Sequence, residues 1–133
     1  MTAPNHIDDY DAITKVLELY IHGVSKGDVG KLKEAFHEDS SMFGSVDGHR
    51  FDMPIAQFFE VAEGAPMDIG GNYRGRITSV VQSGDAAVGT VAEDGCWGQV
   101  SFVDFFTLVR FDDGWKITNK VFTHVEGEMP PMG

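Results

Sequence analysis

The first 26 residues carry apolar side chains at helical intervals. Spacings of three and four connect the members of this set, which are Ile13, Val16, Leu17, Tyr20, Ile21 and Val24. Such spacing places them on one face of a helix. Acidic Asp8 and Asp9 are favourable at a helix N-terminus, and Gly27 suits the other end. The pattern therefore predicts one long amphipathic helix from about residue 8 to residue 26.

A short helix and a pair of short strands are predicted next. Asp28 can cap the helix, whose apolar positions extend to Phe36 and which ends in the segment at residues 37–39. Residues 41–45 and 49–53 follow as paired strands, because an Asp-Gly step between them is typical of a tight turn.

The pattern changes from helical to alternating after a third predicted helix, which Pro54 opens and Gly64 closes. Turn-forming residues then separate four strand candidates, at residues 73–82, 86–93, 100–111 and 115–125. Short links between neighbouring strands favour an antiparallel meander. Helices followed by such a sheet predict an α+β fold, with three N-terminal helices packed on a curved, mostly antiparallel sheet.

Length and composition favour one globular domain. With 133 residues, 42% of them hydrophobic, the chain is long enough to bury its own core. We predict a single domain over residues 1–133, with a core of about 8–125 and a loose tail at 126–133. The apolar stretches are too short to span a membrane. The single cysteine, Cys96, allows no intrachain disulfide, so the reducing cytoplasm is the expected location.

Charge and missing motifs argue against several function classes. A net charge of −11 repels nucleic-acid backbones and anionic membrane surfaces, so neither is expected as a partner. No spacing of His, Cys, Asp and Glu matches a metal site, and no phosphate-binding loop precedes a helix. We therefore expect neither a metal nor a cofactor.

Asp104 differs in character from the rest of its predicted strand. Alternate side chains of a strand share a face, and its neighbours on that face are Val100, Phe102, Phe106 and Leu108. An ionised, unpaired carboxylate there would be costly to bury, so we expect Asp104 to be neutral, hydrogen-bonded or functional. In a structural role it would bond to the backbone or to Tyr20. In a pocket role, Tyr20 and a protonated Asp104 would both donate to one ligand oxygen.

The opposite face of the same strand is apolar as well. Its members are Ser101, Val103, Phe105, Thr107, Val109 and Phe111. Three helices can cover only one face of the sheet, so this face would stand in water in a monomer. We expect a homodimer formed through the outer face of the sheet.

Several segments resemble the NTF2-like superfamily. They are Leu19-Tyr20, Lys26-Gly27-Asp28, LKEAFHED at residues 32–39, FVDFFTLV at 102–109 and DGWKI at 113–117. The sequence NKVF at residues 119–122 is similar to the SnoaL-like or lumazine-binding branch. The resemblance spans about residues 8–125 and implies a cone-shaped fold around an apolar pocket. It leaves the activity open, because the superfamily contains isomerases, cyclases, dehydratases, lyases and proteins without enzymatic activity.

Ketosteroid isomerase is a more distant member of this superfamily, and the resemblance implies roles for three positions. Tyr20 and Asp104 fall where that enzyme has the tyrosine and the protonated aspartate of its oxyanion hole. Gly44 falls where it has the aspartate that abstracts the proton. The base is missing here, so steroid isomerisation by the same route is not expected.

Other residues are candidates for proton transfer and ligand contact. His49 lies on the predicted strand pair by the pocket mouth and can exchange protons near neutral pH. The alternative is that it is a surface residue without a catalytic role. Asn119 is assigned to the inward face of the last strand, where its amide would orient a ligand. Apolar contacts are expected from Phe58, Phe102, Phe106 and Trp97. The sequence leaves open whether Arg74 and Arg76 face the pocket and what His124 does.

Two functions fit these features. The first is a cofactor-independent acid–base enzyme, an isomerase, dehydratase, cyclase or lyase, that acts on a hydrophobic, oxygenated molecule. In it Asp104 and Tyr20 polarise a carbonyl or hydroxyl group, and His49 or a carboxylate near the mouth moves the proton. The second is a non-catalytic ligand-binding or dimerisation module, which Gly44 favours. In both, the ligand is a small hydrophobic or aromatic molecule.

Overall fold

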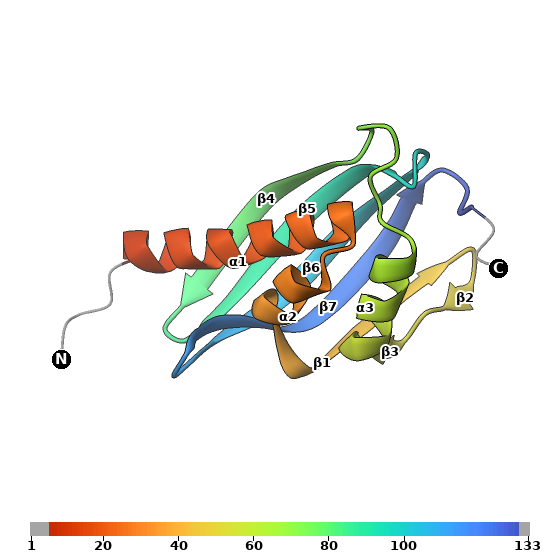
Figure 1. The fold of residues 1–133 in the computed structure, drawn as a ribbon. Helices are drawn as coiled ribbons and strands as arrows, with labels where there is room; N and C mark the ends of the chain where they lie inside the picture. The colour runs from red at the N-terminus through yellow and green to blue at the C-terminus, as the bar shows by residue number, and fades with distance from the viewer. Residues whose placement is uncertain (1–5, 131–133) are drawn as a thin grey trace.

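Figure 1 shows the helices and strands of the computed structural model, which describes residues 6–130. The helices are α1 (His6–Lys26), α2 (Val29–Ala35) and α3 (Ile55–Gly64). The strands are β1 (Phe36–Val46), β2 (His49–Arg50), β3 (Met53–Pro54), β4 (Arg74–Ser83), β5 (Ala86–Cys96), β6 (Val100–Phe111) and β7 (Gly114–Glu126). The predicted α+β class and the order of its elements are confirmed.

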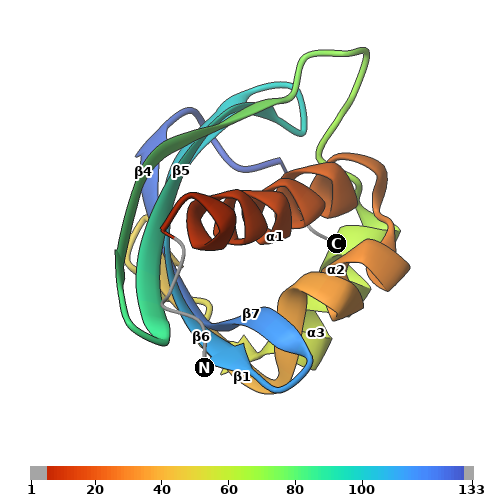
Figure 2. The same cartoon turned by 90° about the vertical axis from the view of Figure 1, so that its left-hand side faces the viewer.

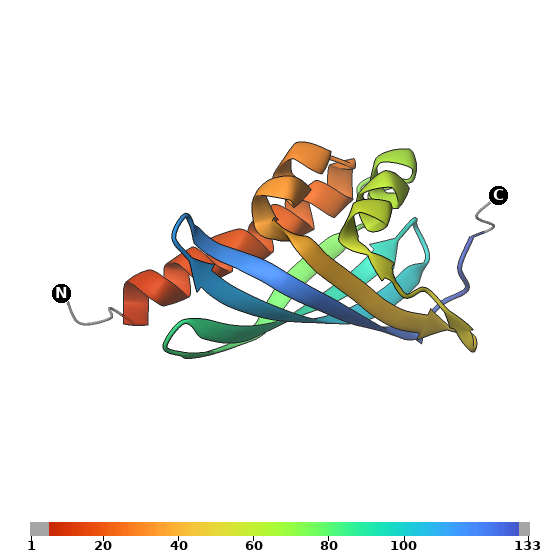
Figure 3. The same ribbon diagram turned by 90° about the horizontal axis from the view of Figure 1, so that it is seen from below.

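One seven-stranded sheet carries the fold, in the order β2-β1-β7-β6-β5-β4, with β3 paired to β1 off this path. Strands β4 to β7 form the predicted antiparallel meander. Strand β1 runs parallel to β7, which makes the sheet mixed but mostly antiparallel. Figure 2 shows the sheet curving around α1, and Figure 3 shows all three helices on the same side of the sheet.

Helix α1 fills the hollow of the sheet with its predicted apolar face. Ile13, Leu17 and Tyr20 are completely buried. Gly89 on β5 allows this close approach, because a Cβ atom there would lie 2.6 Å from the Leu17 side chain. The exposed face of α1 carries Ile7 and Tyr10 near its start and polar side chains beyond them. Within residues 6–130 no helix has the length and apolar character needed to cross a membrane.

The predicted end of the second helix is wrong. Asp28 caps α2 as expected, since its Oδ1 accepts a hydrogen bond from the Lys31 N–H at 3.2 Å. The helix stops at Ala35, however, and the segment at residues 37–39 belongs to β1. The reason is a long-range pairing of Phe36 with Ile117 of β7, which continues the backbone as a strand. A local helical pattern contains no information about such a partner.

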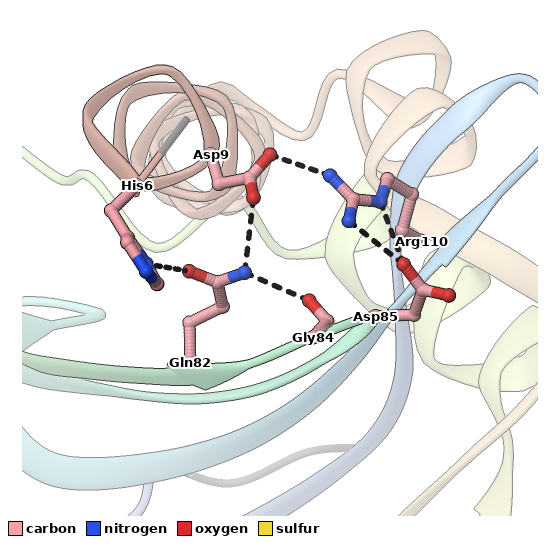
Figure 4. A network of polar contacts seen from close by, with 6 residues as sticks. All are labelled: His6, Asp9, Gln82, Gly84, Asp85 and Arg110. Atoms are coloured by element: carbon pink, nitrogen blue, oxygen red, sulfur yellow. Dashed lines mark hydrogen bonds and ion pairs between the residues drawn. The ribbon is translucent and has the colours of Figure 1, made fainter. Parts of the chain in front are cut away.

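A network of polar side chains ties the N-terminal turn of α1 to the β4–β5 turn and to the end of β6 (Figure 4). The Arg110 guanidinium donates to Asp9 at 2.6 Å and pairs with Asp85 at 2.8 Å. The Gln82 amide also donates to Asp9, at 3.0 Å. Because the Asp9 side chain is only 11% exposed, it depends on these donors to replace water.

We expect Arg110→Ala to destabilise the protein, because it leaves the buried Asp9 carboxylate without its arginine. The thermal unfolding midpoint, measured by circular dichroism, should fall by about 5 °C or more. Arg50→Ala is the control, since Arg50 and Asp52 form an exposed ion pair; its midpoint should change by no more than about 1 °C. Equal midpoints for the two variants would contradict this role of Arg110.

The outer face of the sheet is apolar where β1, β7 and β6 lie side by side. Phe43 pairs with Val121, and Val121 pairs with Phe105. These three side chains are 42%, 39% and 44% exposed, respectively. The helices all lie on the other side, so nothing within residues 6–130 covers this face.

We therefore expect a homodimer through this outer face. Sedimentation velocity at micromolar concentration should give the mass of two chains. Phe105→Asp should yield monomers, because it places a charge at the centre of the buried contact. Ile69→Asp, which alters an exposed apolar residue in the α3–β4 loop, should remain dimeric. A monomeric native protein would refute the expectation.

Candidate functional site

A cavity of about 230 Å³ lies between α3 and the inner face of the sheet, somewhat below the range of about 300–1,000 Å³ that is usual for ligand pockets. Aromatic side chains line much of it, namely Phe51, Phe58, Trp97, Phe102 and Phe122. Four methionines complete most of the apolar wall, namely Met42, Met53, Met67 and Met129. Methionine side chains adapt to irregular shapes, so this wall can follow the outline of a small apolar molecule.

Three of the four predicted apolar contacts lie in this wall. Phe58, Phe102 and Trp97 all line the cavity. The Trp97 indole N–H donates to the Ala65 carbonyl at 2.8 Å, which fixes the ring beside the α3–β4 loop. Phe106 does not line the cavity. It is completely buried and packs edge-on against Tyr20 at a centroid distance of 4.8 Å, so it belongs to the core beneath the site.

A buried polar cluster forms the inner end of the cavity. Its members are Tyr20 of α1, Tyr73 just before β4, Glu93 of β5, Asp104 of β6 and Lys120 of β7. The predicted contact is present, since the Tyr20 hydroxyl lies 2.9 Å from Asp104 Oδ2. The same hydroxyl lies 3.2 Å from Glu93 Oε1, and the Tyr73 hydroxyl donates to Glu93 Oε2 at 2.7 Å. Tyr20, Tyr73 and Lys120, from three different parts of the chain, thus converge on two carboxyl groups.

Of the two carboxyl groups in the cluster, Glu93 is the one whose pKa is shifted in favour of the protonated form. Burial raises the pKa of Glu93 well above its ordinary value, and the charge and hydrogen bonding of Asp104 raise it further. Lys120 and the Tyr73 hydroxyl oppose this with smaller effects. Burial and the carboxyl groups also raise the pKa values of both tyrosines, so each hydroxyl stays protonated.

Lys120 and Asp104 face each other without a complete hydrogen bond. Lys120 Nζ lies 3.7 Å from Asp104 Oδ1, and both side chains are less than 5% exposed. Within residues 6–130 the only hydrogen-bond acceptor of Nζ is the sulfur of Met42, at 3.3 Å. Asp104 Oδ1 is buried and has no hydrogen-bond partner among the described residues. A donor and an acceptor with spare capacity therefore meet at the cavity wall.

The expected pair of ligand donors, Tyr20 and a protonated Asp104, is not what the structure holds. The Tyr20 hydroxyl is completely buried and engaged by the two carboxyl groups, and Tyr20 does not line the cavity. Lys120 instead lines the cavity, with its Nζ 3.7 Å from Asp104 Oδ1. Tyr20 therefore lies behind Asp104 and outside the cavity lining.

Gly44 confirms that the site lacks a base on β1. It faces inward, and a Cβ atom at this position would overlap the ring of Phe122. The aromatic ring therefore occupies the space that the catalytic aspartate of ketosteroid isomerase would need by the resemblance described above. A carboxylate cannot be restored here without moving Phe122.

His49 and Asn119 do not reach the cavity. His49 is exposed at the β1–β2 turn and does not line the cavity. Asn119 lies on the outer face, because Thr118 forms a bulge between the pairs Leu108–Ile117 and Thr107–Asn119. The extra residue reverses the alternation of β7, and Lys120 takes the inward position.

The structure also answers the open questions about Arg74, Arg76 and His124. Both arginines are exposed and line a surface groove beside α1, away from the cavity. His124 is half-buried on the inner side of β7, with its ring 5.9 Å from that of Phe102. None of these residues lines the cavity.

The predicted loose tail is wrong for its described part. Glu126 ends β7, and Met129 packs against the core and lines the cavity. The Gln99 amide donates to the Glu128 carbonyl and holds the segment in place. In Figure 1 this segment lies at the same end of the molecule as β2 and the β5–β6 turn. Residues 131–133 lie outside the described part of the chain.

Sequence reasoning missed Glu93 and Lys120. A signal for Glu93 was present, because it shares strand parity with Ala87, Gly89 and Val91, all of which are buried. No such signal existed for Lys120, since regular alternation would turn it outward. Among the described residues no group of three or more His, Cys, Asp and Glu side chains is placed to hold a metal ion.

The raised pKa of Glu93 predicts a loss of stability with increasing pH. From about pH 4.3 the unfolded chain releases this proton while the folded protein retains it, so the free energy of unfolding falls until the folded pKa is reached. Glu93→Gln should remove this slope, so that the free energy of unfolding, measured with urea, falls less between pH 4 and pH 8 in the variant than in the native protein. Glu60→Gln, at an exposed position, should keep the native slope. Parallel profiles for Glu93→Gln and the native protein would contradict the assignment.

Comparison with known proteins places this arrangement in a family. The profile of the family described as "Putative lumazine-binding" matches residues 8–123. A relative named aldolase FrzH, from Cladobotryum sp., is 25% identical over 114 residues, which are 86% of this chain and 90% of that protein.

Solved structures agree with the family match. An NTF2-like protein of unknown function from Methylobacillus flagellatus KT is 30% identical, with a TM-score of 0.83 over 95% of this chain and 99% of that one. Another from Shewanella baltica OS155 is 26% identical, with a TM-score of 0.84 over 94% and 100% of the two chains. The chain belongs to the family described as "Putative lumazine-binding", within the NTF2-like superfamily.

Proposed function

We propose that the protein is a cofactor-independent acid–base enzyme that enolises a small hydrophobic carbonyl compound bound in the cavity. In this proposal Asp104 is the base that removes the proton from the carbon next to the carbonyl group. Lys120 donates to the carbonyl oxygen and stabilises the negative charge that develops on it. The enolate is an intermediate shared by isomerases, dehydratases and carbon–carbon lyases, so the proposal names the step and not the final product.

The observation that carries the proposal is the unsatisfied pair of Lys120 Nζ and Asp104 Oδ1, 3.7 Å apart at the inner end of an apolar cavity. Burying an amino group whose only acceptor among the described residues is a sulfur atom, beside a carboxyl oxygen without a hydrogen bond to any of them, costs free energy, which a ligand with a suitable oxygen and an acidic C–H group would recover. The apolar wall supplies affinity for the body of the molecule, and the pair fixes its orientation.

The other members of the cluster position the base. Tyr20 donates to the second oxygen of Asp104, Oδ2, and thereby leaves Oδ1, which lies 3.7 Å from Lys120 Nζ, without a hydrogen bond to the described residues. Glu93 stays protonated through its raised pKa, so it does not add a second negative charge beside the base. In this proposal one carboxyl group acts as the base while its neighbour stays neutral, a division of roles that is typical of acid–base sites.

The relative named as an aldolase supports the same class of chemistry, because an aldol reaction proceeds through an enolate or its equivalent. A non-catalytic binding protein is the second candidate. The closure of the Gly44 position by Phe122 favours it, since the route used by ketosteroid isomerase is blocked.

Deuterium exchange tests the proposal without knowledge of the natural substrate. Phenylacetone in D2O is the probe, and proton NMR follows the loss of its α-proton signals. The native protein should accelerate exchange above the buffer rate, and Asp104→Asn should lower this acceleration by about 100-fold or more. Asp112→Asn, at an exposed position in the β6–β7 turn, should match the native protein.

Two outcomes would contradict the enzyme proposal. Native protein that binds phenylacetone in a thermal-shift titration but leaves the exchange rate at the buffer value would favour the non-catalytic candidate. Unchanged exchange in Asp104→Asn, with its fold verified by circular dichroism, would show that another group is the base.

A further inference from the structure

Lys120 differs from every other lysine of the chain in its surroundings. Lys15, Lys26, Lys31 and Lys33 are exposed, and Lys116 is half-exposed on the same strand as Lys120. Lys120 is 3% exposed, and Nζ lies 4.5 Å from the ring centre of Phe58 and 5.1 Å from that of Phe122. Aromatic rings thus surround the amino group on its protein sides, while Lys120 itself lines the cavity.

A carbonyl compound in the cavity therefore meets an amino group that no strong hydrogen bond holds back. Its protein contacts are the weak acceptor sulfur of Met42 at 3.3 Å and the carboxylate of Asp104 at 3.7 Å. That carboxylate is close enough to take a proton from nitrogen after a small movement, which would free the lone pair for attack. A hydroxyl or amide acceptor bonded to Nζ would have hindered this.

We propose that Lys120 forms an imine with the carbonyl carbon of the ligand, an aldehyde or an unhindered ketone on an apolar body. The inference rests on the proposed function and gives Lys120 a covalent role in it. The C–N bond forms as the carbonyl π bond breaks, and the carbonyl oxygen leaves as water. Of the three ammonium protons, two leave with that water and one remains on the iminium nitrogen, so atoms and charge balance without a further reactant.

The neighbouring groups suit each stage of this reaction. Asp104 accepts the first proton from Nζ and can return it to the departing oxygen. Tyr20, whose hydroxyl also contacts Glu93, holds Asp104 in place through its hydrogen bond to Oδ2. The resulting iminium withdraws electrons from the adjacent carbon more strongly than a hydrogen-bonded carbonyl does. The apolar wall limits the water that would hydrolyse the imine.

Reductive trapping tests the inference. Native protein is incubated with phenylacetone and sodium cyanoborohydride, then digested and analysed by mass spectrometry. Lys120 should gain the mass of the probe less one oxygen atom, at a rate at least about tenfold above that of any other lysine, because the cavity holds the carbonyl beside it. Lys116→Arg should be labelled at Lys120 as the native protein is.

Lys120→Arg keeps the positive charge but cannot form a stable imine under these conditions, and it should lose the fast labelling. Lys120→Met serves the same purpose if arginine does not fit the buried position, and circular dichroism verifies the fold of each. Labelling spread over the exposed lysines, with Lys120 unmodified, would overturn the inference. If α-proton exchange nevertheless depended on Asp104, the proposed function would stand with Lys120 as a hydrogen-bond donor only.

Discussion

Two carboxyl groups and a lysine lie in the apolar interior of the cone, and the need to satisfy them constrains everything around them. The Tyr20 hydroxyl reaches from α1 to the carboxyl groups of β5 and β6, and the Tyr73 hydroxyl reaches Glu93 of β5 from the segment before β4. The two bonds of Tyr20 fix the position of α1 along strands β5 and β6. Burial raises the pKa of Glu93 and so favours its neutral form, and the Lys120 amino group lies 3.7 Å from the other carboxyl group, that of Asp104.

The backbone of β7 decides which polar side chain completes this cluster. The bulge at Thr118 turns Lys120 toward the cavity and leaves Asn119 on the outer face. Thr118 Oγ1 lies 2.8 Å from Thr107 Oγ1 and 3.2 Å from the Thr107 carbonyl, which secures the extra residue against the neighbouring strand. Bulges often redirect side chains next to functional sites, and the outcome here is an amino group at the wall of an apolar cavity.

The same face of the sheet shows how one fold can support different chemistry. The Phe122 ring lies against Gly44 and closes the position from which ketosteroid isomerase would use a base. Polar groups remain at the inner end, where β5, β6 and β7 contribute Glu93, Asp104 and Lys120. Family membership therefore determines the cone and its cavity, whereas the side chains that project into the cavity determine what it can do.

Periodicity in the sequence was sufficient for the α+β class, the three helices and the four-stranded meander, because these depend on local spacing and turn chemistry. Strand parity also identified Asp104 as a buried carboxyl group and, with the stripe of α1, its contact with Tyr20. Prediction from the sequence failed where the backbone is irregular or where a strand pairs with a distant segment. A single bulge exchanged the roles of Asn119 and Lys120, and the pairing of Phe36 with Ile117 turned a helix end into a strand. Only the tertiary structure placed Glu93 and Lys120 beside Asp104. The three residues lie on three different strands, β5, β6 and β7, and come together because all three side chains project to the inner face of the sheet, where a buried amino group needs a carboxyl group nearby.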